Sequence, residues 1–257
     1  MTSLAVSPIG TVRLISGFDQ RFGEEFEVEA FIPADLPTSV DLPGSVWLVV
    51  SEAMAELGRL DAAAALVPNP QLLTRIATRR EAVGTSALEG TYADLTEVFA
   101  ADVLPLDEQE EAVAPNVREV MNYTRAADSA HAWIQDRPIT SAMISALQSM
   151  IVRGTDADGA DAGAVRTTQV FIGAKRRRVT EARFVPPPPG DELIAQYERW
   201  IDWLAAPEPA EGLQLLVRVA LAHYQFETLH PYTDGNGRLG RLVAALQLMK
   251  EGALRAP

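Results

Sequence analysis

The sequence predicts a mostly α-helical protein with one small β-hairpin, on two observations. From residue 42 onward, apolar residues recur at spacings of three and four, which is the period of an amphipathic helix. Residues 165–189 have a different pattern, in which apolar residues alternate with others on both sides of a turn made by a glycine and a basic run. Four prolines, which cannot enter a β-ladder, end this hairpin pattern. With 257 residues, the chain can form one large domain or two modest ones.

Composition limits the class of protein. The chain is 47% hydrophobic and 22% charged, as soluble globular proteins are, and no run of eighteen apolar residues could span a membrane. The absence of cysteine excludes disulfides, thiolate zinc sites and cysteine nucleophiles. The N-terminus lacks a basic start followed by an apolar core, so it is no secretory signal. We therefore expect a cytoplasmic protein with no membrane partner.

The net charge of −13 argues against nucleic-acid binding by this chain, because phosphate contacts need clustered cations. One basic run, residues 175–178 (Lys-Arg-Arg-Arg), is the exception. We interpret it as a solvated turn and leave open a contact with an anionic partner.

The first predicted region, residues 1–110, joins an irregular segment to helices. The first 45 residues are rich in proline, glycine and short apolar runs, which predicts extended or irregular structure. The helical period then predicts helices over residues 45–60 and 69–90. The second of these begins with an Asn69 cap and Pro70 in its first position, and it ends at Gly90.

The second predicted region, residues 111–257, is a helical core that includes the hairpin. Helices are predicted over residues 116–136, 140–154, 191–206 and 212–229, and another begins at Arg238. A loop rich in glycine and aspartate, residues 156–164, precedes the hairpin.

The stretch His-Pro-Tyr-Thr-Asp-Gly-Asn-Gly-Arg, residues 230–238, is the strongest functional signal. Pro231 disfavours helical geometry in the residue before it, so the preceding helix should end at His230. Gly235 and Gly237 permit a positive φ and leave no side chain to block a ligand. Free N–H groups in such a loop, with the positive end of the next helix, form an anion site.

Charged residues around this loop indicate a phosphate ligand. Arg238 and Arg241 lie near the start of a helix, where the dipole disfavours cations, so both should have an anionic partner. Asp234 offers a hard oxygen ligand beside the cradle, which suits Mg²⁺ bridging to phosphate oxygens, and Asn236 offers an amide. His230 can serve as a base towards a hydroxyl that attacks the phosphate, although a helix C-terminus and phosphates both raise a histidine pKa.

The stretch "HPYTDGNGRLGR" resembles the signature of Fic-domain proteins, with Tyr232 in place of the usual phenylalanine. The stretch "REAVGTSALEGT" resembles the inhibitory segment of that family, here Thr85 to Gly90. The likeness covers roughly residues 42 to 250 and implies a Fic-type helical bundle whose hairpin, called the flap, binds the target protein.

The resemblance implies a protein adenylyltransferase that moves AMP from Mg²⁺-ATP to a tyrosine, serine or threonine hydroxyl. His230 would be the base and Asp234 would hold Mg²⁺. Phosphate binding would fall to Gly235, Asn236, Gly237, Arg238 and Arg241, with Arg241 on the γ-phosphate. The flap would clamp the target by strand addition, through Thr168, Gln169, Val170, Phe171 and Ile172.

The same resemblance implies autoinhibition. Glu89 lies at the end of a predicted helix, where the dipole disfavours a carboxylate and favours a cationic partner. The family pairing puts this glutamate on Arg241, in the place of the γ-phosphate, within a segment that also contains Thr85 and Ser86.

Other readings stay open at this point. The same fold could remove AMP or transfer another nucleotidyl or phosphoryl group, or it could be an inactive regulatory module. The target could be the chain itself, and a homodimer is left open. Relatives with this layout commonly continue with further helices after residue 250, so we expect a fragment or a short member with a truncated C-terminal extension.

Overall fold

A computed structural model describes residues 9–105, 112–173, 178–206 and 213–254, without the side chain of Gln71. Most of the basic run at residues 175–178 therefore lies outside the described residues.

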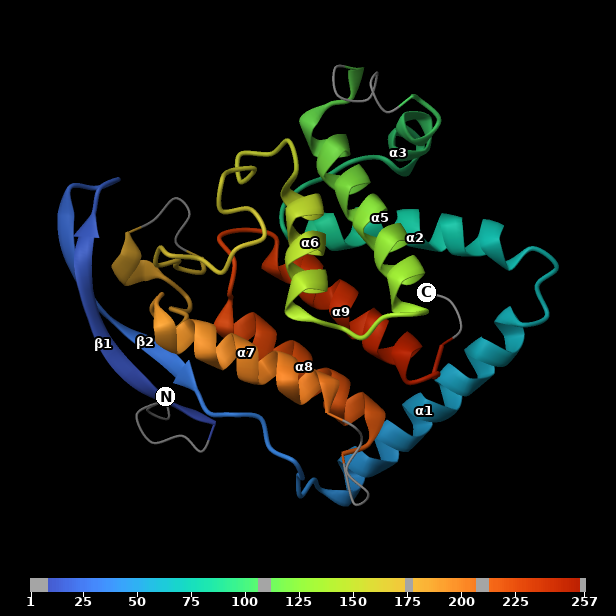
Figure 1. Cartoon of the computed structure of the whole chain (residues 1–257), viewed down its shortest axis with the longest axis horizontal. Helices are drawn as coiled ribbons and strands as arrows, with labels where there is room; N and C mark the ends of the chain where they lie inside the picture. The colour runs from blue at the N-terminus through green and yellow to red at the C-terminus, as the bar shows by residue number, and fades with distance from the viewer. Residues whose placement is uncertain (1–8, 106–111, 174–177, 207–212, 255–257) are drawn as a thin grey trace.

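The described part of the chain is mostly helical, as predicted (Figure 1). Its helices are α1 (Gly44–Ala64), α2 (Pro70–Leu88), α3 (Leu95–Asp102), α5 (Pro115–Ile134), α6 (Ser141–Val152), α7 (Asp191–Ala205), α8 (Leu215–Leu229) and α9 (Asn236–Lys250), with a 3₁₀ turn, η2, at Val179–Glu181. Helix α2 starts as predicted, because the Asn69 side chain accepts a hydrogen bond from Leu72 N at 3.2 Å. None of the described helices has the length and apolar character needed to cross a membrane.

The N-terminal segment is more regular than its composition predicted. Strands β1 (Gly10–Asp19) and β2 (Glu24–Pro33) form a two-stranded antiparallel sheet, paired from Gly10–Pro33 to Asp19–Glu24. Only the part after β2 is irregular, up to the start of α1. The hairpin curves along the edge of the molecule beside η2 (Figure 1).

The predicted flap hairpin forms, but its arms pair over a short distance. Between residues 165 and 185 the described backbone makes a single antiparallel bridge, Ile172 with Phe184. The return arm forms η2, pairs with Ile172 through Arg183 and Phe184, and then accepts at Val185 O from Phe31 N of β2 at 2.9 Å. The Phe26 and Phe171 rings pack edge to face, 5.3 Å apart. The N-terminal hairpin therefore also supports this segment.

Helix α5 lies at the centre of the core and packs against α2, α3, α6 and α9. One cluster of buried residues includes Ala82 and Val98 from the first predicted region and Leu147, Phe226 and Leu242 from the second. Both predicted regions contribute to this cluster, and the boundary between them at residue 110 stays a prediction.

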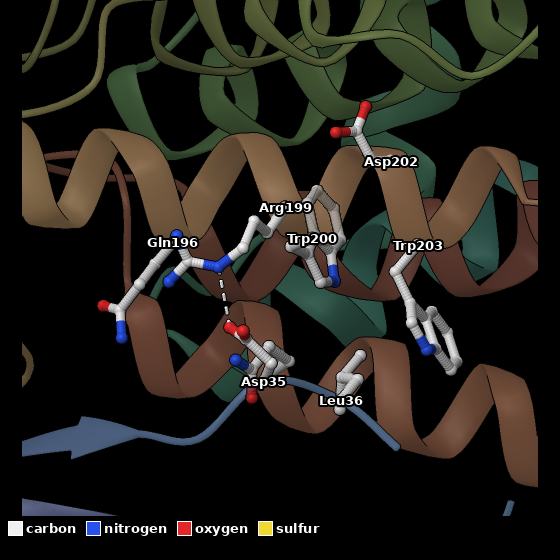
Figure 2. Close-up of a pocket in the computed structure, with 8 residues that line it drawn as sticks. Asp35, Leu36, Gln196, Arg199, Trp200, Asp202 and Trp203 are labelled. Atoms are coloured by element: carbon white, nitrogen blue, oxygen red, sulfur yellow. Dashed lines mark hydrogen bonds and ion pairs between the residues drawn. The ribbon is translucent and has the colours of Figure 1, made fainter. Parts of the chain in front are cut away.

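A pocket of about 340 Å³ lies between α7, α8 and the segment after β2 (Figure 2). Its lining residues are Asp35, Leu36, Gln196, Arg199, Trp200, Asp202, Trp203 and Gln225. An Arg199–Asp35 ion pair of 2.8 Å stands at its rim. The Trp200 ring packs on Phe226, 4.9 Å between centroids, so this wall of the pocket is also part of the core behind the motif loop.

Candidate active site

The motif forms the helix–loop–helix that the sequence predicted. Helix α8 ends at Leu229, and His230 is its C-cap in the left-handed conformation, φ 47° and ψ 59°. His230 is the one non-glycine residue with a positive φ in the described chain. Gly235, at φ 80°, is the N-cap of α9. The backbone therefore turns sharply twice, once at the predicted base and once at the predicted cradle.

Asn236 braces the loop instead of facing a ligand. Its Oδ1 accepts from Tyr232 N at 3.0 Å, and its Nδ2 donates to Tyr232 O at 2.8 Å. The side chain is buried, and both of its polar ends are engaged by the loop. A phosphate cradle here would use the backbone N–H groups of the first turn of α9, which have no intrahelical acceptor.

Tyr232, the departure from the family signature, is accommodated in the core. Its hydroxyl lies 2.9 Å from the hydroxyl of Tyr197 on α7, and both side chains are buried. Its ring packs near Phe226, with centroids 6.4 Å apart. A buried hydroxyl with a partner costs little, so the extra oxygen is tolerated.

Asp234 is exposed at the edge of the loop. Its Oδ1 accepts from Gly235 N at 2.6 Å, and its side chain is 55% exposed. The described residues contain no group of three or more acidic or histidine ligands that could hold a metal. The donor set therefore fits a cation held by one carboxylate, water and substrate phosphate, which is the way Mg²⁺ binds nucleotides.

Arg238 is buried between two carboxylates, with 3% of its side chain exposed. Its Nη1 donates to Glu119 Oε2 at 3.2 Å, and its Nη2 lies 3.7 Å from Asp234 Oδ1. Sequence reasoning missed Glu119, which also accepts from Thr91 Oγ1 at 2.9 Å. The available signal was a carboxylate next to buried Val120 on α5, since a partly buried charge is stabilised by a partner.

Arg241 contacts the predicted inhibitory segment. Its Nη2 donates to Glu89 Oε1 at 2.6 Å and to Thr85 O at 3.1 Å, and its Nε donates to Thr85 Oγ1 at 2.5 Å. The side chains of Arg241 and Glu89 are 28% and 40% exposed. The structure thus brings together Glu89, Thr85 and Arg241, more than 150 residues apart in sequence.

The backbone at the end of α2 holds Glu89 in place. Gly90 has φ 89°, Thr91 N donates to Ser86 O at 3.0 Å, and Gly90 N donates to Ala87 O at 3.0 Å. This is a Schellman motif with glycine after the cap. It directs the Glu89 carboxylate towards the start of α9, where a Cβ at Gly237 would overlap Glu89 Oε1. A carboxylate therefore lies where the helix terminus would attract an anion.

The environment of His230 favours a neutral imidazole. Its pKa is lowered from 6.5 to about 4, chiefly by burial and also by the charge of Arg166, against the opposing effect of the Glu227 carbonyl and of the Glu89 and Asp234 carboxylates. The upward shift expected for a histidine at a helix C-terminus is thus outweighed by desolvation.

Glu227 on α8 is a second carboxylate that sequence reasoning missed. Burial raises its pKa to about 7, with Arg241 lowering and Glu89 raising it. Its Oε1 has no hydrogen-bond partner among the described residues and lies against Gly240. It extends the charged group around Arg241 on the side opposite α2.

The predicted flap residues lie along the segment that precedes the bridge. Gln169 Nε2 donates to Val170 O and Pro186 O, both at 3.0 Å, and holds the two arms together. Thr168 is exposed, and its carbonyl accepts from Arg166 Nη1 at 3.0 Å. Arg166 also contacts His230 O at 2.8 Å, so one buried side chain joins the flap to the motif loop. Arg166 was not predicted.

Family models match most of the chain: the Fic/DOC family N-terminal model matches residues 47–132, and the Fic/DOC family model matches residues 138–248. The chain belongs to the Fic/DOC family. This agrees with the resemblance seen in residues 230–241 and 85–90.

Curated relatives of this Fic protein include protein adenylyltransferases. One from Drosophila grimshawi is 31% identical over 170 residues, which are 65% of this chain and 31% of that protein. Protein adenylyltransferase fic-1 from Caenorhabditis elegans is 38% identical over 97 residues, which are 38% of this chain and 17% of that protein. The chain thus spans less than a third of the length of these relatives.

Solved structures share the fold. A Fic family protein from Desulfovibrio desulfuricans superposes with a TM-score of 0.61 at 24% identity, over 84% of this chain and 61% of that one. Fic-1 of C. elegans, residues 134–508, gives 0.60 at 23% identity, over 81% of this chain and 60% of that one. The likeness confirms the Fic-type helical architecture.

Proposed function

We propose that this chain is a protein adenylyltransferase that transfers AMP from ATP to a hydroxyl of a target protein and is held inactive by Glu89. The observation that carries the proposal is the Glu89 carboxylate, bound to Arg241 at 2.6 Å and lying over Gly237 at the start of α9. An anion site close in sequence to a partly buried, neutral histidine suits transfer of a phosphate-containing group.

In the active state, the triphosphate would take the place of the Glu89 carboxylate. The N–H groups at the start of α9, those of Asn236 and Gly237 together with that of Gly235 once it leaves Asp234 Oδ1, and the Arg241 guanidinium would bind its oxygens. Arg238, fixed between Glu119 and Asp234, would stand behind this cradle and contribute charge to it. Mg²⁺ held by Asp234 would neutralise phosphate charge when bound.

The chemistry would fall to His230. Its neutral imidazole would take the proton of the target hydroxyl as the hydroxyl oxygen attacks the α-phosphorus of ATP. A bond from that oxygen to phosphorus forms, the bond to the bridging oxygen of the leaving group breaks, and pyrophosphate departs. The low pKa of His230 keeps it able to accept a proton at neutral pH.

The target would be held by the flap. Thr168 to Ile172 contain one backbone bridge, at Ile172, so most of the peptide groups of this segment are not engaged in a ladder. An extended target segment could pair with this backbone, which gives alignment with little sequence preference.

The curated relatives named protein adenylyltransferase support this reaction over other transfers by the same fold. A cytoplasmic location and a homodimer stay predictions of the sequence.

The test uses ATP labelled on the α-phosphate, Mg²⁺ and a bacterial lysate. Wild type, Glu89→Gly, and Glu89→Gly with His230→Asn are compared, since asparagine tolerates the positive φ of residue 230. Leu88→Gly is the matched control, because exposed Leu88 lies at the same helix end and does not touch Arg241. We expect strong labelling of protein in Glu89→Gly alone.

Equal labelling in Leu88→Gly would show that loosening of α2, and not the carboxylate, controls activity. Absence of label in every folded variant would overturn adenylyl transfer. Loss of label from a modified target would instead indicate removal of AMP.

A further inference from the structure

Arg166 is a buried cation without an acidic partner. Its side chain is 1% exposed, and no carboxylate of the described residues lies within ion-pair distance of it. Burial lowers its pKa to about 10, which still leaves it charged at neutral pH. Burying an unpaired charge is costly, so a protein tolerates it only where other groups compensate. The compensating groups here are all backbone carbonyls.

These carbonyls lie on both sides of His230. Arg166 Nε donates to His230 O at 2.8 Å and Nη2 donates to Leu229 O at 3.4 Å. The backbone N of Arg166 donates to Pro231 O at 2.8 Å. Three consecutive peptide groups, before and after the histidine, are thus tied to one residue.

This contact explains the unusual backbone of His230. The last carbonyls of a helix lack intrahelical donors and carry the negative end of the helix dipole. A guanidinium at the end of α8 supplies these carbonyls with hydrogen-bond donors and places a positive charge at the negative end of the dipole. A left-handed conformation is unfavourable for a non-glycine residue and persists only where the surroundings fix it. By holding the peptide groups on either side, Arg166 sets the φ and ψ of His230 and so the direction of its ring.

The same guanidinium reaches both arms of the flap. Nη1 donates to Thr168 O at 3.0 Å at the start of the flap, and Nη2 donates to Pro187 O at 2.6 Å in the proline run after it. The planar fork of arginine can bind these divergent acceptors at once, which the single ammonium of a lysine cannot do.

We propose that Arg166 is a positioning residue that sets the place of His230 relative to the flap, and hence to a target hydroxyl held there. The inference rests on the proposed function. It assigns Arg166 no contact with ATP, so its loss should slow transfer to the target without weakening nucleotide binding.

The test places Arg166→Lys and Arg166→Gln in the Glu89→Gly background. Arg218→Lys and Arg218→Gln are the matched controls, because Arg218 is also buried and caps a helix, donating from Nη2 to Ala206 O at 3.0 Å, on the far end of α7. The readouts are kcat and KM for a labelled target, the Kd for ATP by calorimetry, and Tm.

We expect kcat to fall at least about tenfold in both Arg166 variants, since a small misplacement of a catalytic base costs rate steeply, while the Kd for ATP changes less than about threefold. The Arg218 variants should lose a similar amount of Tm and keep kcat within about twofold. Should one Arg166 variant fail to fold, the other decides.

An unchanged kcat in folded Arg166 variants, or a loss of ATP affinity equal to the loss of kcat, would overturn the inference. A parallel fall of kcat and Tm in the Arg166 and Arg218 variants would show a purely structural role and would also overturn it. Failure of the proposed function would give a different result, because the Glu89→Gly parent would then transfer no label to the target.

Discussion

The candidate site has a floor and a roof that are built differently. The floor is formed by the end of α8, the motif loop and Arg238. Its buried polar side chains bind their neighbours: Asn236 binds the backbone of Tyr232, and Arg238 binds Glu119. The roof is the last turn of α2, where half-exposed Glu89 meets Arg241. Breaking an ion pair between a carboxylate and a guanidinium costs much stability when the pair is buried and little when it is exposed. On the proposed function, a fixed floor would keep the geometry for transfer, and a releasable roof would permit regulation.

The largest expected effect on stability tests the burial of His230 in the floor. Its pKa in the folded protein, about 4, is below the ordinary 6.5. As pH falls from 6.5 to 4, the unfolded chain binds a proton that the folded chain does not, so stability is lost across this window, by about 3 kcal/mol for this group. Urea unfolding of wild type and His230→Asn at several pH values checks this.

In His230→Asn this part of the pH dependence should be absent, because asparagine binds no proton in this range. Identical loss of stability in the two proteins between pH 6.5 and 4 would show that His230 is solvated and not a buried neutral base.

The next effect compares the two arginine–carboxylate pairs directly. Glu119→Gln leaves Arg238 without its main charge partner, and we expect a loss of about 2 kcal/mol, reduced from a fully buried pair because Glu119 is 27% exposed. Glu89→Gln at the roof should cost less than about 1 kcal/mol, since exposed pairs contribute little. Denaturant unfolding at neutral pH measures both. Equal losses would mean that roof and floor do not differ as described.

The smallest effect concerns the hydroxyl pair beneath the loop. Tyr232→Phe restores the usual family residue but leaves the Tyr197 hydroxyl without its partner at 2.9 Å, for an expected loss of about 1 kcal/mol. Tyr197→Phe, made singly and together with Tyr232→Phe, completes a double-mutant cycle. A coupling energy near zero would show that the two hydroxyls do not stabilise each other.

Local physics explains what was predicted well. The caps of α2, Asn69 and Gly90, act on neighbouring residues, and so do Pro231 and Gly235, which end one helix and start the next. Such short-range preferences are legible in sequence because their causes lie within a few residues. The signals in the motif loop lie within a few residues of one another, which is why residues 230–241 could be singled out without a structure.

The sequence predicted the flap hairpin but not how short its pairing is. Alternating apolar residues around a turn fit a hairpin, and its arms do pair at one bridge, Ile172 with Phe184, after which Val185 O accepts from β2. The apolar period of residues 45–60 correctly predicted the helix α1. It also suggested a buried face, but no residue of α1 is buried. Periodicity reports which face could be buried and not whether anything covers it.

The sequence by itself determined the helical class, the helix–loop–helix of the motif and the chemistry of its side chains, because propensity, capping and residue type are local. Only the tertiary structure decided which polar side chains meet: Glu119 with Arg238 and Thr85 with Arg241, across more than a hundred residues. It also decided that Arg166, an unremarked residue before the flap, holds the backbone of His230. Contacts of this kind depend on how helices pack, and no window of sequence contains both partners.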